Sequence, residues 1–340
     1  MRNTSWVPDY MIIDFQDSVW ETLRATAERL PHALLIHGVA GIGKLALAER
    51  FAQFLLCEAR AGGTDACGRC EACRWFMAGN HPDLRRLEPE ALSRQLAAAG
   101  DDEPGSGARV PKPSLEIKVD QVRELADFLN IGSHRGRLRI ALVHPAEDMN
   151  VHAANALLKS LEEPAPGAVF LLVSHRPARL LPTIRSRCVA LAVPLPEREA
   201  ALAWLKTQRG PEPARWLAFA GGAPLKALEY GEGECADVIS RLLQAISRGE
   251  RAAIADTVAT REELELLAEV LQKVAMDRAL ARIGAATKYG STSATAGAAT
   301  ALEWLAYARL MGRNRALAKH PLNAKLFASE MLSAMPLNDA

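Results

Sequence analysis

A glycine-rich segment that ends in lysine, GVAGIGK at residues 38–44, stands between an apolar run at 33–37 and a helical pattern at 45–56. This order of strand, loop and helix is that of a phosphate-binding loop, in which backbone N–H groups and a helix N-terminus face phosphate oxygens. The lysine adds a cation for the β- and γ-phosphates. An ordinary glycine-rich turn is the alternative. The predicted nucleotide-binding residues are Gly38, Gly41, Gly43 and Lys44.

The sequence around this loop lacks the residues that normally hold magnesium and activate water. Leu45 stands where working loops carry a Ser or Thr hydroxyl that ligates Mg²⁺. The apolar run 139–143 predicts the strand that should end in an acidic Walker B pair, but His144 and Pro145 follow it. Glu147 lies further on and is expected to begin the next turn. We therefore expect no hydrolysis and no Mg²⁺ at this site, and the binding of ATP or ADP stays open.

Apolar periodicity predicts an α/β domain followed by a helical region. The runs at 33–37 and 139–143 and a third at 169–174 are expected to be strands, with amphipathic helical patterns between them. This alternation is typical of a parallel sheet with helices packed on its faces. After about residue 194 only helical patterns remain, and the small-residue stretch 284–300 is expected to be a flexible connection.

Charge and hydropathy limit the classes of partner. The formal net charge of +1 gives no global basic field, so contact with nucleic acid must be local or made through other proteins. Arg135, Arg137 and Arg139 are expected on a solvated face. No run approaches the roughly 20 apolar residues that cross a bilayer, and residues 1–10 lack a secretory pattern. A soluble cytoplasmic chain without membrane contact is the expectation.

Four of the six cysteines are concentrated in one short segment. Tight Cys-x2-Cys spacing presents sulfur atoms at the separation that tetrahedral zinc requires, and four thiolates leave no open position for water. The pattern predicts a structural Zn²⁺ site, with an iron–sulfur cluster or disulfides as the alternatives. Cys188 and Cys235 have no partner by spacing and are expected to be small buried hydrophobic residues. The predicted metal ligands are Cys57, Cys67, Cys70 and Cys73.

Several further motifs occur in a fixed order after the cysteines. Asn155-Ala-Leu-Leu-Lys-Ser-Leu-Glu-Glu-Pro164 is followed by a strand that ends in the polar residue Ser174, and then by Ser186-Arg187-Cys188. His81-Pro-Asp-Leu84 precedes them. Together with the phosphate loop and the cysteine insertion, this order resembles the bacterial clamp-loader ATPases of the AAA+ superfamily over most of the chain.

The resemblance implies an AAA+ fold in three parts. Residues 1–193 are expected to form the parallel-sheet, ATPase-like domain, with the zinc module at about 57–80. Residues 194–235 are expected to form a small helical lid, and 236–340 an all-α collar that joins five subunits into a ring. The implied partners are the gamma/tau ATPase subunits and the delta subunit of the DNA polymerase III clamp loader. The sliding clamp and primer–template DNA would be met through that complex.

The resemblance also gives two residues roles. Arg187 matches the arginine finger that reaches the ATP of a neighbouring subunit, where a guanidinium stabilises charge that develops on the γ-phosphate. An ordinary surface salt bridge is the alternative for Arg187. Ser174 matches a sensor that hydrogen-bonds phosphate or water, although a serine satisfied at a strand end explains it equally. Leu225 stands where the ATPase subunits carry a second sensing arginine.

The resulting hypothesis is a subunit of the DNA polymerase III clamp loader that helps to load the sliding clamp during DNA replication. It would supply Arg187 to a neighbour and have no ATPase activity of its own, as one component of a DNA-directed DNA polymerase holoenzyme. A self-sufficient AAA+ ATPase that uses Glu147 or His144 is one alternative. A scaffold whose zinc ribbon binds DNA is the other.

Overall fold

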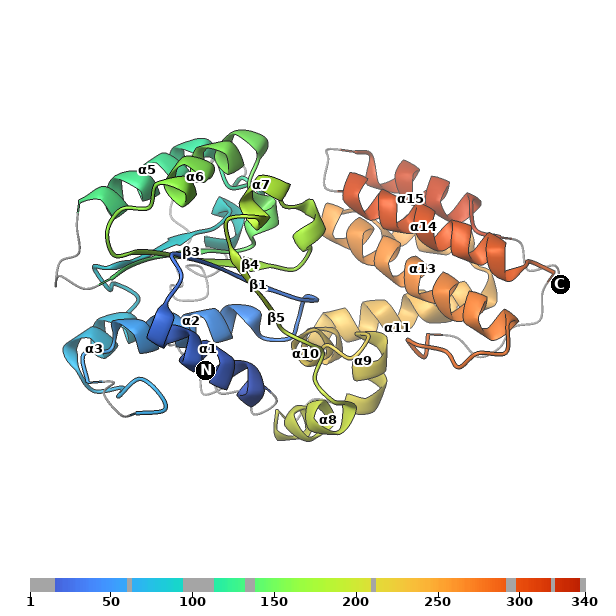
Figure 1. Ribbon diagram of the computed structural model, residues 1–340. Coiled ribbons are helices and arrows are strands. Elements are labelled where there is room, and N and C mark those ends of the chain that lie inside the picture. The colour runs from blue at the N-terminus through green and yellow to red at the C-terminus, as the bar shows by residue number, and fades with distance from the viewer. Residues whose placement is uncertain are drawn as a thin grey trace, which may run out of the picture. The chain divides into compact units, whose positions relative to one another are not determined.

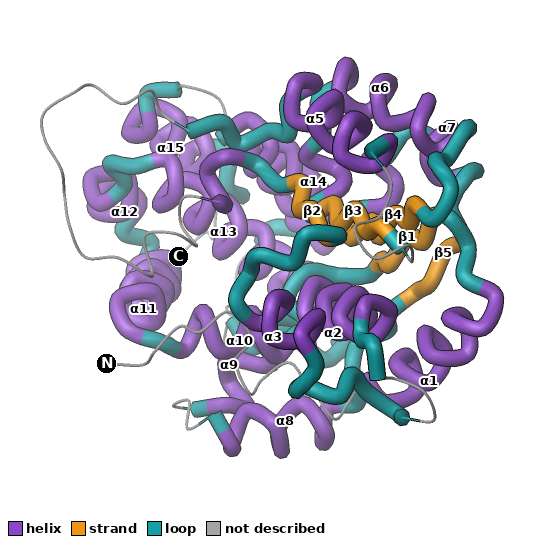
Figure 2. Tube along the Cα trace, turned by 90° about the vertical axis from the view of Figure 1, so that its left-hand side faces the viewer, coloured by secondary structure: helices purple, strands orange, loops and turns teal. Residues whose placement is uncertain are grey.

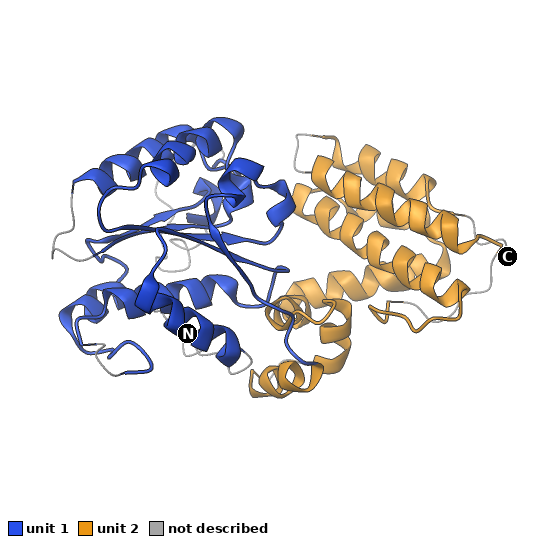
Figure 3. Ribbon diagram, viewed as in Figure 1, with its two compact units in different colours: residues 1–197 blue, residues 198–340 orange. Residues whose placement is uncertain are grey.

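The computed structural model describes residues 16–59, 63–93, 113–131, 138–208, 212–291, 298–318 and 322–336. The chain forms two compact units, residues 1–197 and 198–340 (Figure 3). The division into an ATPase-like domain, a lid and a collar at 1–193, 194–235 and 236–340 stays a prediction. Each unit is described by itself below.

Unit 1 is built on a five-stranded sheet in the order β2-β3-β4-β1-β5 (Figures 1 and 2). Every neighbouring pair of these strands is parallel. The sheet confirms the predicted α/β class and its three predicted strands, and it adds β2 and β5 to them. The strands are β1 (Ala33–His37), β2 (Leu84–Leu87), β3 (Arg139–Val143), β4 (Ala168–Ser174) and β5 (Val189–Ala192).

Helices cover both faces of this sheet, with α5, α6 and α7 on one side and α1, α2 and α3 on the other (Figure 1). This arrangement explains why every residue of the central strands β3 and β4 is buried, since strands covered on both faces are apolar throughout. The helices of unit 1 are α1 (Asp17–Thr26), α2 (Lys44–Leu56), α3 (Glu71–Met77), α5 (Val119–Asn130), α6 (Val151–Glu162) and α7 (Pro182–Arg185).

One cluster of core residues lies between the sheet and α5 and α6. Leu125 and Leu129 of α5 and Leu157 and Leu161 of α6 are buried in one cluster with Phe170 of β4. Each pair is four residues apart, so both side chains project from the same face of their helix. In α6 this is the apolar pattern from which the helix was predicted. The core fixes the sheet, and the sheet aligns the carboxyl ends of β1, β3 and β4 on one edge.

Among its described residues, unit 2 contains helices and no strand. They confirm the helical pattern predicted after residue 194. The helices are α8 (Arg198–Thr207), α9 (Pro213–Phe219), α10 (Pro224–Gly231), α11 (Gly233–Arg248), α12 (Arg251–Thr257), α13 (Arg261–Arg282), α14 (Ala301–Leu317) and α15 (Ala324–Ser333).

A group of buried charges joins three of these helices. The carboxylate of Glu269 on α13 lies 2.9 Å from Lys273 Nζ, 2.7 Å from Arg315 Nη2 on α14 and 3.5 Å from Lys226 Nζ on α10. The Tyr230 hydroxyl on α10 also donates to it. Burial alone would raise the pKa of Glu269, but the three cations and this hydroxyl hold it at about 2. The carboxylate is therefore ionised at neutral pH and holds the three helices together.

Part of the stretch expected to be a flexible connection is fixed. The carboxylate of Asp277, on α13 and fully buried, accepts hydrogen bonds from the backbone N–H groups of Lys288, Tyr289 and Ser291 and from the Ser291 hydroxyl, at 2.7–2.9 Å. The expectation is wrong for residues 288–291, because composition does not show that an aspartate on a preceding helix binds this backbone. Residues 292–297 lie outside the described part.

Candidate functional site

The phosphate loop forms at the carboxyl end of β1, where the sequence predicts it. Gly41 and Gly43 both have φ of 79°, in the left-handed region that favours glycine, and Gly43 is the N-cap of α2. A Cβ on Gly38 would lie 2.4 Å from the carbonyl oxygen of Val193, so no larger residue fits there. The loop thus has the backbone course of a phosphate cradle that opens onto a helix N-terminus.

Lys44 is the first residue of α2 and only 2% exposed. Its Nζ donates a hydrogen bond to the carbonyl oxygen of Val39, within the loop. Burial lowers the pKa of Lys44 to about 8, and the nearby carboxylate of Glu147 opposes this shift. The lysine therefore keeps its charge at neutral pH, and its ammonium has N–H donors besides the one bonded to Val39 that a phosphate oxygen would accept.

A histidine pair occupies the place of the acidic pair beyond β3. His144 directly follows β3, and its Nε2 lies 3.3 Å from Nε2 of His175, which directly follows β4. The ring planes are inclined at 79°, with centroids 5.2 Å apart. Burial and the neighbouring His175 lower the pKa of His144 to about 3. His144 is therefore neutral at physiological pH and supplies no negative charge to a divalent cation.

Among the described residues, Glu147 is the carboxylate at this edge of the sheet whose charge affects the pKa of Lys44. It lies in the short 3₁₀ turn η4 (Ala146–Asp148), as predicted, and its Oε1 accepts a hydrogen bond from the backbone N–H of His175 at 2.9 Å. Its Oε2 is buried without a hydrogen-bond partner among those residues. This contact could not be predicted from local sequence patterns, because it joins residues that follow two different strands. Leu45, beside Lys44, brings no oxygen atom to the site.

Ser174 ends β4 and pairs with His37 of β1, next to the phosphate loop. It is fully buried, and its Oγ accepts a hydrogen bond from the backbone N–H of Arg176 at 3.2 Å. Its carbonyl oxygen accepts from Gly38 N at 3.3 Å. The serine is thus satisfied at the strand end and also adjoins the loop, so both interpretations of it stay open.

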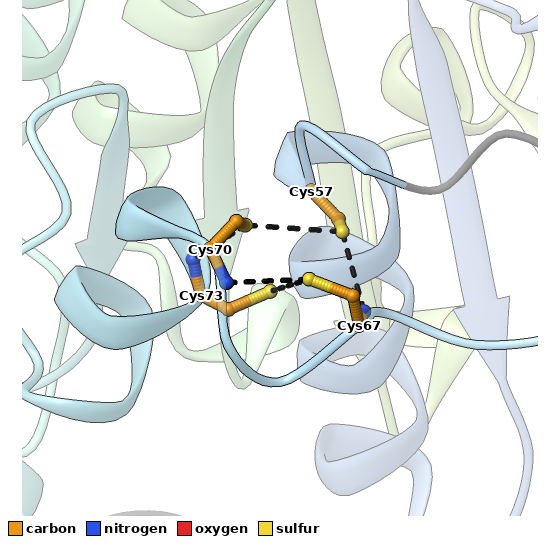
Figure 4. A group of neighbouring side chains, drawn as sticks. All are labelled: Cys57, Cys67, Cys70 and Cys73. Carbon is orange, nitrogen blue, oxygen red and sulfur yellow. Dashed lines mark hydrogen bonds between the residues drawn. The ribbon is translucent and has the colours of Figure 1, made fainter.

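The four predicted ligand cysteines lie together (Figure 4). Cys57 directly follows α2, Cys67 lies in the loop, Cys70 caps the N-terminus of α3, and Cys73 lies within α3. All four Sγ atoms are within 4.8 Å of one another, and the pairs Cys57–Cys70 and Cys67–Cys73 are each 4.0 Å apart. None of the four is in a disulfide.

This geometry fits one tetrahedral metal ion. Zinc–sulfur bonds of about 2.3 Å place the sulfur atoms of a tetrahedral site about 3.8 Å apart. Backbone N–H groups of Cys67, Cys70 and Cys73 point to the Sγ atoms of Cys57, Cys67 and Cys70 at 3.3–3.4 Å. Hydrogen bonds of this kind, from Arg69 and Cys70, lower the pKa of Cys67 to about 6, whereas burial raises the pKa of the Cys57 and Cys73 thiols. A bound cation would be what holds those two cysteines as thiolates.

Arg187 follows α7 and is half-buried at the surface of unit 1. Its Nη2 lies 2.5 Å from the carboxylate of Glu162, the last residue of α6, and its Nη1 donates to the carbonyl oxygen of Thr183 at 2.9 Å. Within this chain the arginine thus forms a surface salt bridge, which was the alternative to the finger role. The finger role itself concerns a second chain and stays a prediction.

Arg139 does not lie on a solvated face, contrary to the expectation. It is 7% exposed, its guanidinium stacks 4.6 Å from the Phe128 ring centre, and its Nε lies 3.6 Å from the carboxylate of Asp83. Arg139 is the first residue of the buried strand β3, so its side chain lies in the core. A cluster of charged residues in the sequence does not reveal this. Arg135 and Arg137 lie outside the described residues.

Two further expectations concern the burial of the cysteines outside the cluster and the presence of membrane-spanning helices. Cys188 and Cys235 are half-buried, so they are less buried than expected. Burial raises the pKa of the Cys188 thiol to about 11. None of the described helices combines the length and the apolar composition that a membrane span requires.

Comparison with known proteins agrees with these motifs. Residues 15–196 match the model of the family "DNA polymerase III, delta subunit". A curated Pseudomonas aeruginosa protein named DNA polymerase III subunit delta' is 46% identical over 227 residues, which are 65% of this chain and 62% of that protein. The chain thus spans less than two thirds of that relative. A Haemophilus influenzae protein named DNA polymerase III subunit tau/gamma is 33% identical over 226 residues, 66% of this chain and 28% of that protein.

Among solved structures, a DNA polymerase III gamma subunit-related protein from Thermotoga maritima aligns with 92% of this chain and 97% of its own, at 18% identity and a TM-score of 0.45. This similarity is too low to carry an argument about function.

Proposed function

Because the chain belongs to the DNA polymerase III delta-subunit family, with delta' proteins as its curated relatives, we propose that it is a clamp-loader subunit that hydrolyses no ATP itself. In this proposal it works in the cytoplasm during DNA replication, in one ring with gamma/tau ATPase subunits and a delta subunit. The ring loads the sliding clamp onto primed DNA. Residues 194–235 are its lid, and 236–340 form the collar through which the subunits join.

One observation carries the proposal: the phosphate loop is folded, but the side chains around it do not suit magnesium. Lys44 and the three glycines have the arrangement of a phosphate site. Leu45 and the neutral His144 stand where an oxygen ligand and a carboxylate are needed for Mg²⁺. A subunit with such a site can have a structural role in the ring, with or without bound ATP or ADP, while other subunits hydrolyse ATP.

Arg187 is the proposed contribution of this chain to catalysis. In GTPases an arginine finger supplied by a neighbouring protein is worth roughly 10³–10⁵ in rate. A surface arginine held by an exposed carboxylate can leave that partner at little cost, because such ion pairs contribute only about 0–1 kcal/mol. The pairing of Arg187 with Glu162 is therefore compatible with release toward a phosphate of the neighbouring subunit.

The proposed metal is Zn²⁺, bound by Cys57, Cys67, Cys70 and Cys73. The donor set and sulfur separations support a site without an open coordination position, so the ion would hold the segment after α2 in place. It would take no part in chemistry. An iron–sulfur cluster would use the same thiolates and is distinguished by its visible absorption.

Reconstitution tests the proposed function. The chain is mixed with gamma/tau and delta subunits, and the mass of the product and its ATPase rate with primed DNA and clamp are measured. We expect one stable assembly whose rate depends on this chain, since mixtures that lack it should miss one arginine finger. Failure to join the assembly, or the same rate without the chain, would refute the proposal.

A self-sufficient ATPase is the second candidate, and one observation favours it. Glu147 lies close enough to Lys44 to affect its pKa, and one of its oxygens has no hydrogen-bond partner among the described residues. Multiple-turnover hydrolysis by the isolated chain would decide for this candidate. The remaining alternative, a scaffold whose zinc ribbon binds DNA, would require tight duplex binding by the chain alone, which the formal net charge of +1 does not favour.

A further inference from the structure

A pocket of about 790 Å³ opens in unit 2, far along the sequence from the phosphate loop. Residues of α9, α11 and α13 line it, and its wall includes three arginines, Arg215, Arg241 and Arg278, with Ser240 and Ser291. Its volume is in the range of small-ligand sites. One carboxylate, that of Asp237, also lines it. The ionisable side chains of the wall therefore carry a net positive charge.

Arg278 is the unusual member of this wall. It is only 4% exposed, its guanidinium lies 4.7 Å from the Trp304 ring centre, and its Nε and Nη1 have no hydrogen-bond partner among the described residues. Burial lowers its pKa, the nearby Arg251 and Arg282 lower it further, and only the Tyr307 hydroxyl acts in the opposite direction. A buried cation without an anionic partner is unfavourable, so this charge requires an anion from elsewhere.

The neighbouring carboxylates do not provide that anion. Asp277, next to Arg278 on α13, already accepts four hydrogen bonds from residues 288–291. These bonds hold Gly290 and Ser291 at the pocket wall, where Gly290 has a left-handed φ of 59°. The aspartate thus builds the wall beside Arg278 and leaves the arginine's charge uncompensated.

The rim of the pocket offers further donors. Arg215 is anchored by Glu212 at 2.7 Å, and its Nη2 donates to the Ser240 hydroxyl at 3.1 Å. Since Ser240 accepts this bond, its own O–H can donate to a ligand. Arg241 is exposed, and its Nε makes one long bond of 3.4 Å to a backbone carbonyl, which leaves most of its guanidinium N–H groups for a ligand. Planar guanidinium groups with a hydroxyl donor suit a tetrahedral oxyanion.

We propose that this pocket binds a phosphoryl group, with Arg278 as the buried countercharge and Arg241, Arg215 and Ser240 as donors at the rim. A phosphoryl group is preferred to a carboxylate because it carries more charge and has acceptor oxygens in several directions, which match donors from α9, α11 and α13. Two sources share this chemistry, a backbone phosphate of nucleic acid and a small phosphate compound. The site is separate from the phosphate loop and independent of the proposed ring.

The test uses the full chain with Lys44→Ala, which removes the cation of the phosphate loop. Pyrophosphate is titrated by calorimetry, and its effect on the melting temperature is compared with NaCl of equal ionic strength. We expect binding and a raised melting temperature. Arg278→Gln should weaken binding at least ten-fold and Arg241→Gln several-fold. The control Arg248→Gln changes an exposed arginine of the same helix as Arg241, outside the pocket wall, and should bind like the parent chain.

The proposal is wrong if pyrophosphate does not bind the Lys44→Ala chain. It is also wrong if the Arg278→Gln and Arg241→Gln variants bind pyrophosphate as tightly as that parent chain. Should Arg278→Gln fail to fold, Arg241→Gln combined with Ser240→Ala decides by the same criterion. A labelled oligothymidylate distinguishes the two sources. If the oligothymidylate competes with pyrophosphate, the pocket binds nucleic-acid phosphate. If pyrophosphate binds and the oligothymidylate does not compete with it, the pocket binds a small phosphate compound.

Discussion

The guanidinium of Arg187 and the carboxylate of Glu162 form an ion pair of 2.5 Å that joins the loop after α7 to the end of α6. Arg187 belongs to the Ser-Arg-Cys motif and Glu162 to the Leu-Glu-Glu-Pro segment, which lie apart in the sequence. Two motifs of the family resemblance therefore meet in one contact. The pair holds the arginine in a defined position on the surface of unit 1.

Replacing Arg187 tests its proposed role in a neighbouring subunit. Arg187→Ala should lower the ATPase rate at the neighbouring subunit's ATP site by ten-fold or more, measured in the reconstituted assembly with primed DNA and clamp. The reason is that the negative charge of the transition state loses the guanidinium that stabilises it. Arg185→Ala removes an exposed arginine of α7 and should leave that rate unchanged. An Arg187 variant with full activity would eliminate the finger role.

Replacing Glu162 separates the finger from the ion pair. Glu162→Gln should change the free energy of unfolding by less than about 1 kcal/mol, as for other exposed pairs. It should also leave the ATPase rate of the assembly within two-fold of wild type. If Glu162→Gln slows the assembly as much as Arg187→Ala does, the pair itself is what the assembly needs.

The isolated chain should not hydrolyse ATP. With Leu45 and the neutral His144 beside the loop, no oxygen ligand from these positions holds Mg²⁺. Phosphate release from wild-type chain and from Lys44→Ala should therefore be the same in the presence of Mg²⁺. Turnover that requires Mg²⁺ and disappears with Lys44→Ala would show that Glu147 supplies the missing carboxylate.

The cysteine cluster should contain one zinc ion per chain, measured by elemental analysis of protein purified without added metal. Cys70→Ser should lose the ion and lower the melting temperature by about 5–10 °C, a change of a few kcal/mol for a unit of this size. Cys235→Ser, which changes a cysteine outside the cluster, should retain the ion. Iron with visible absorption in place of zinc would contradict the assignment.

The buried carboxylate of Glu269 should make unit 2 sensitive to acid. Its pKa is about 2 in the folded chain against an ordinary 4.5, so its contribution is fully present above pH 4.5 and is lost as the pH falls toward 2. The shift corresponds to about 3 kcal/mol. Glu269→Gln should lower the free energy of unfolding at pH 7 by roughly 3–5 kcal/mol, since three cations lose their partner.

Urea denaturation at pH 7 and pH 3 measures this difference. The gap between wild type and Glu269→Gln should narrow at pH 3, while Glu265→Gln on the same helix should behave like wild type at both values. A gap of equal size at both pH values would mean that the glutamate acts through packing and that its charge is unimportant.

The elements that the sequence predicts are those with a strong local signal. The three apolar strands coincide with β1, β3 and β4, and glycine and cysteine spacing predict the phosphate loop and the cysteine cluster. β2 and β5 were not predicted. β2 is Leu-Arg-Arg-Leu, with two charged residues inside it, and β5 is the apolar run Val-Ala-Leu-Ala, which is only four residues long and mostly exposed at the sheet edge.

Contacts between distant polar residues were beyond prediction. The pairing of His144 with His175 and the bond from His175 to Glu147 depend on the alignment of β3 with β4, which no local pattern encodes. The position of Arg139 was predicted wrongly for the same reason, since its partner Asp83 lies 56 residues earlier in the sequence, before β2. Periodicity reports which face of an element is buried, and only the sheet order shows which side chains meet there.

Helix α2 has Lys44 as its first residue and Cys57 directly after its last, so its 13 residues span about 20 Å from the phosphate loop to the thiol cluster. The proposed Zn²⁺ would therefore hold one end of the helix whose other end carries the phosphate-loop lysine. Loss of that ion should then disturb the phosphate loop as well as the segment after α2.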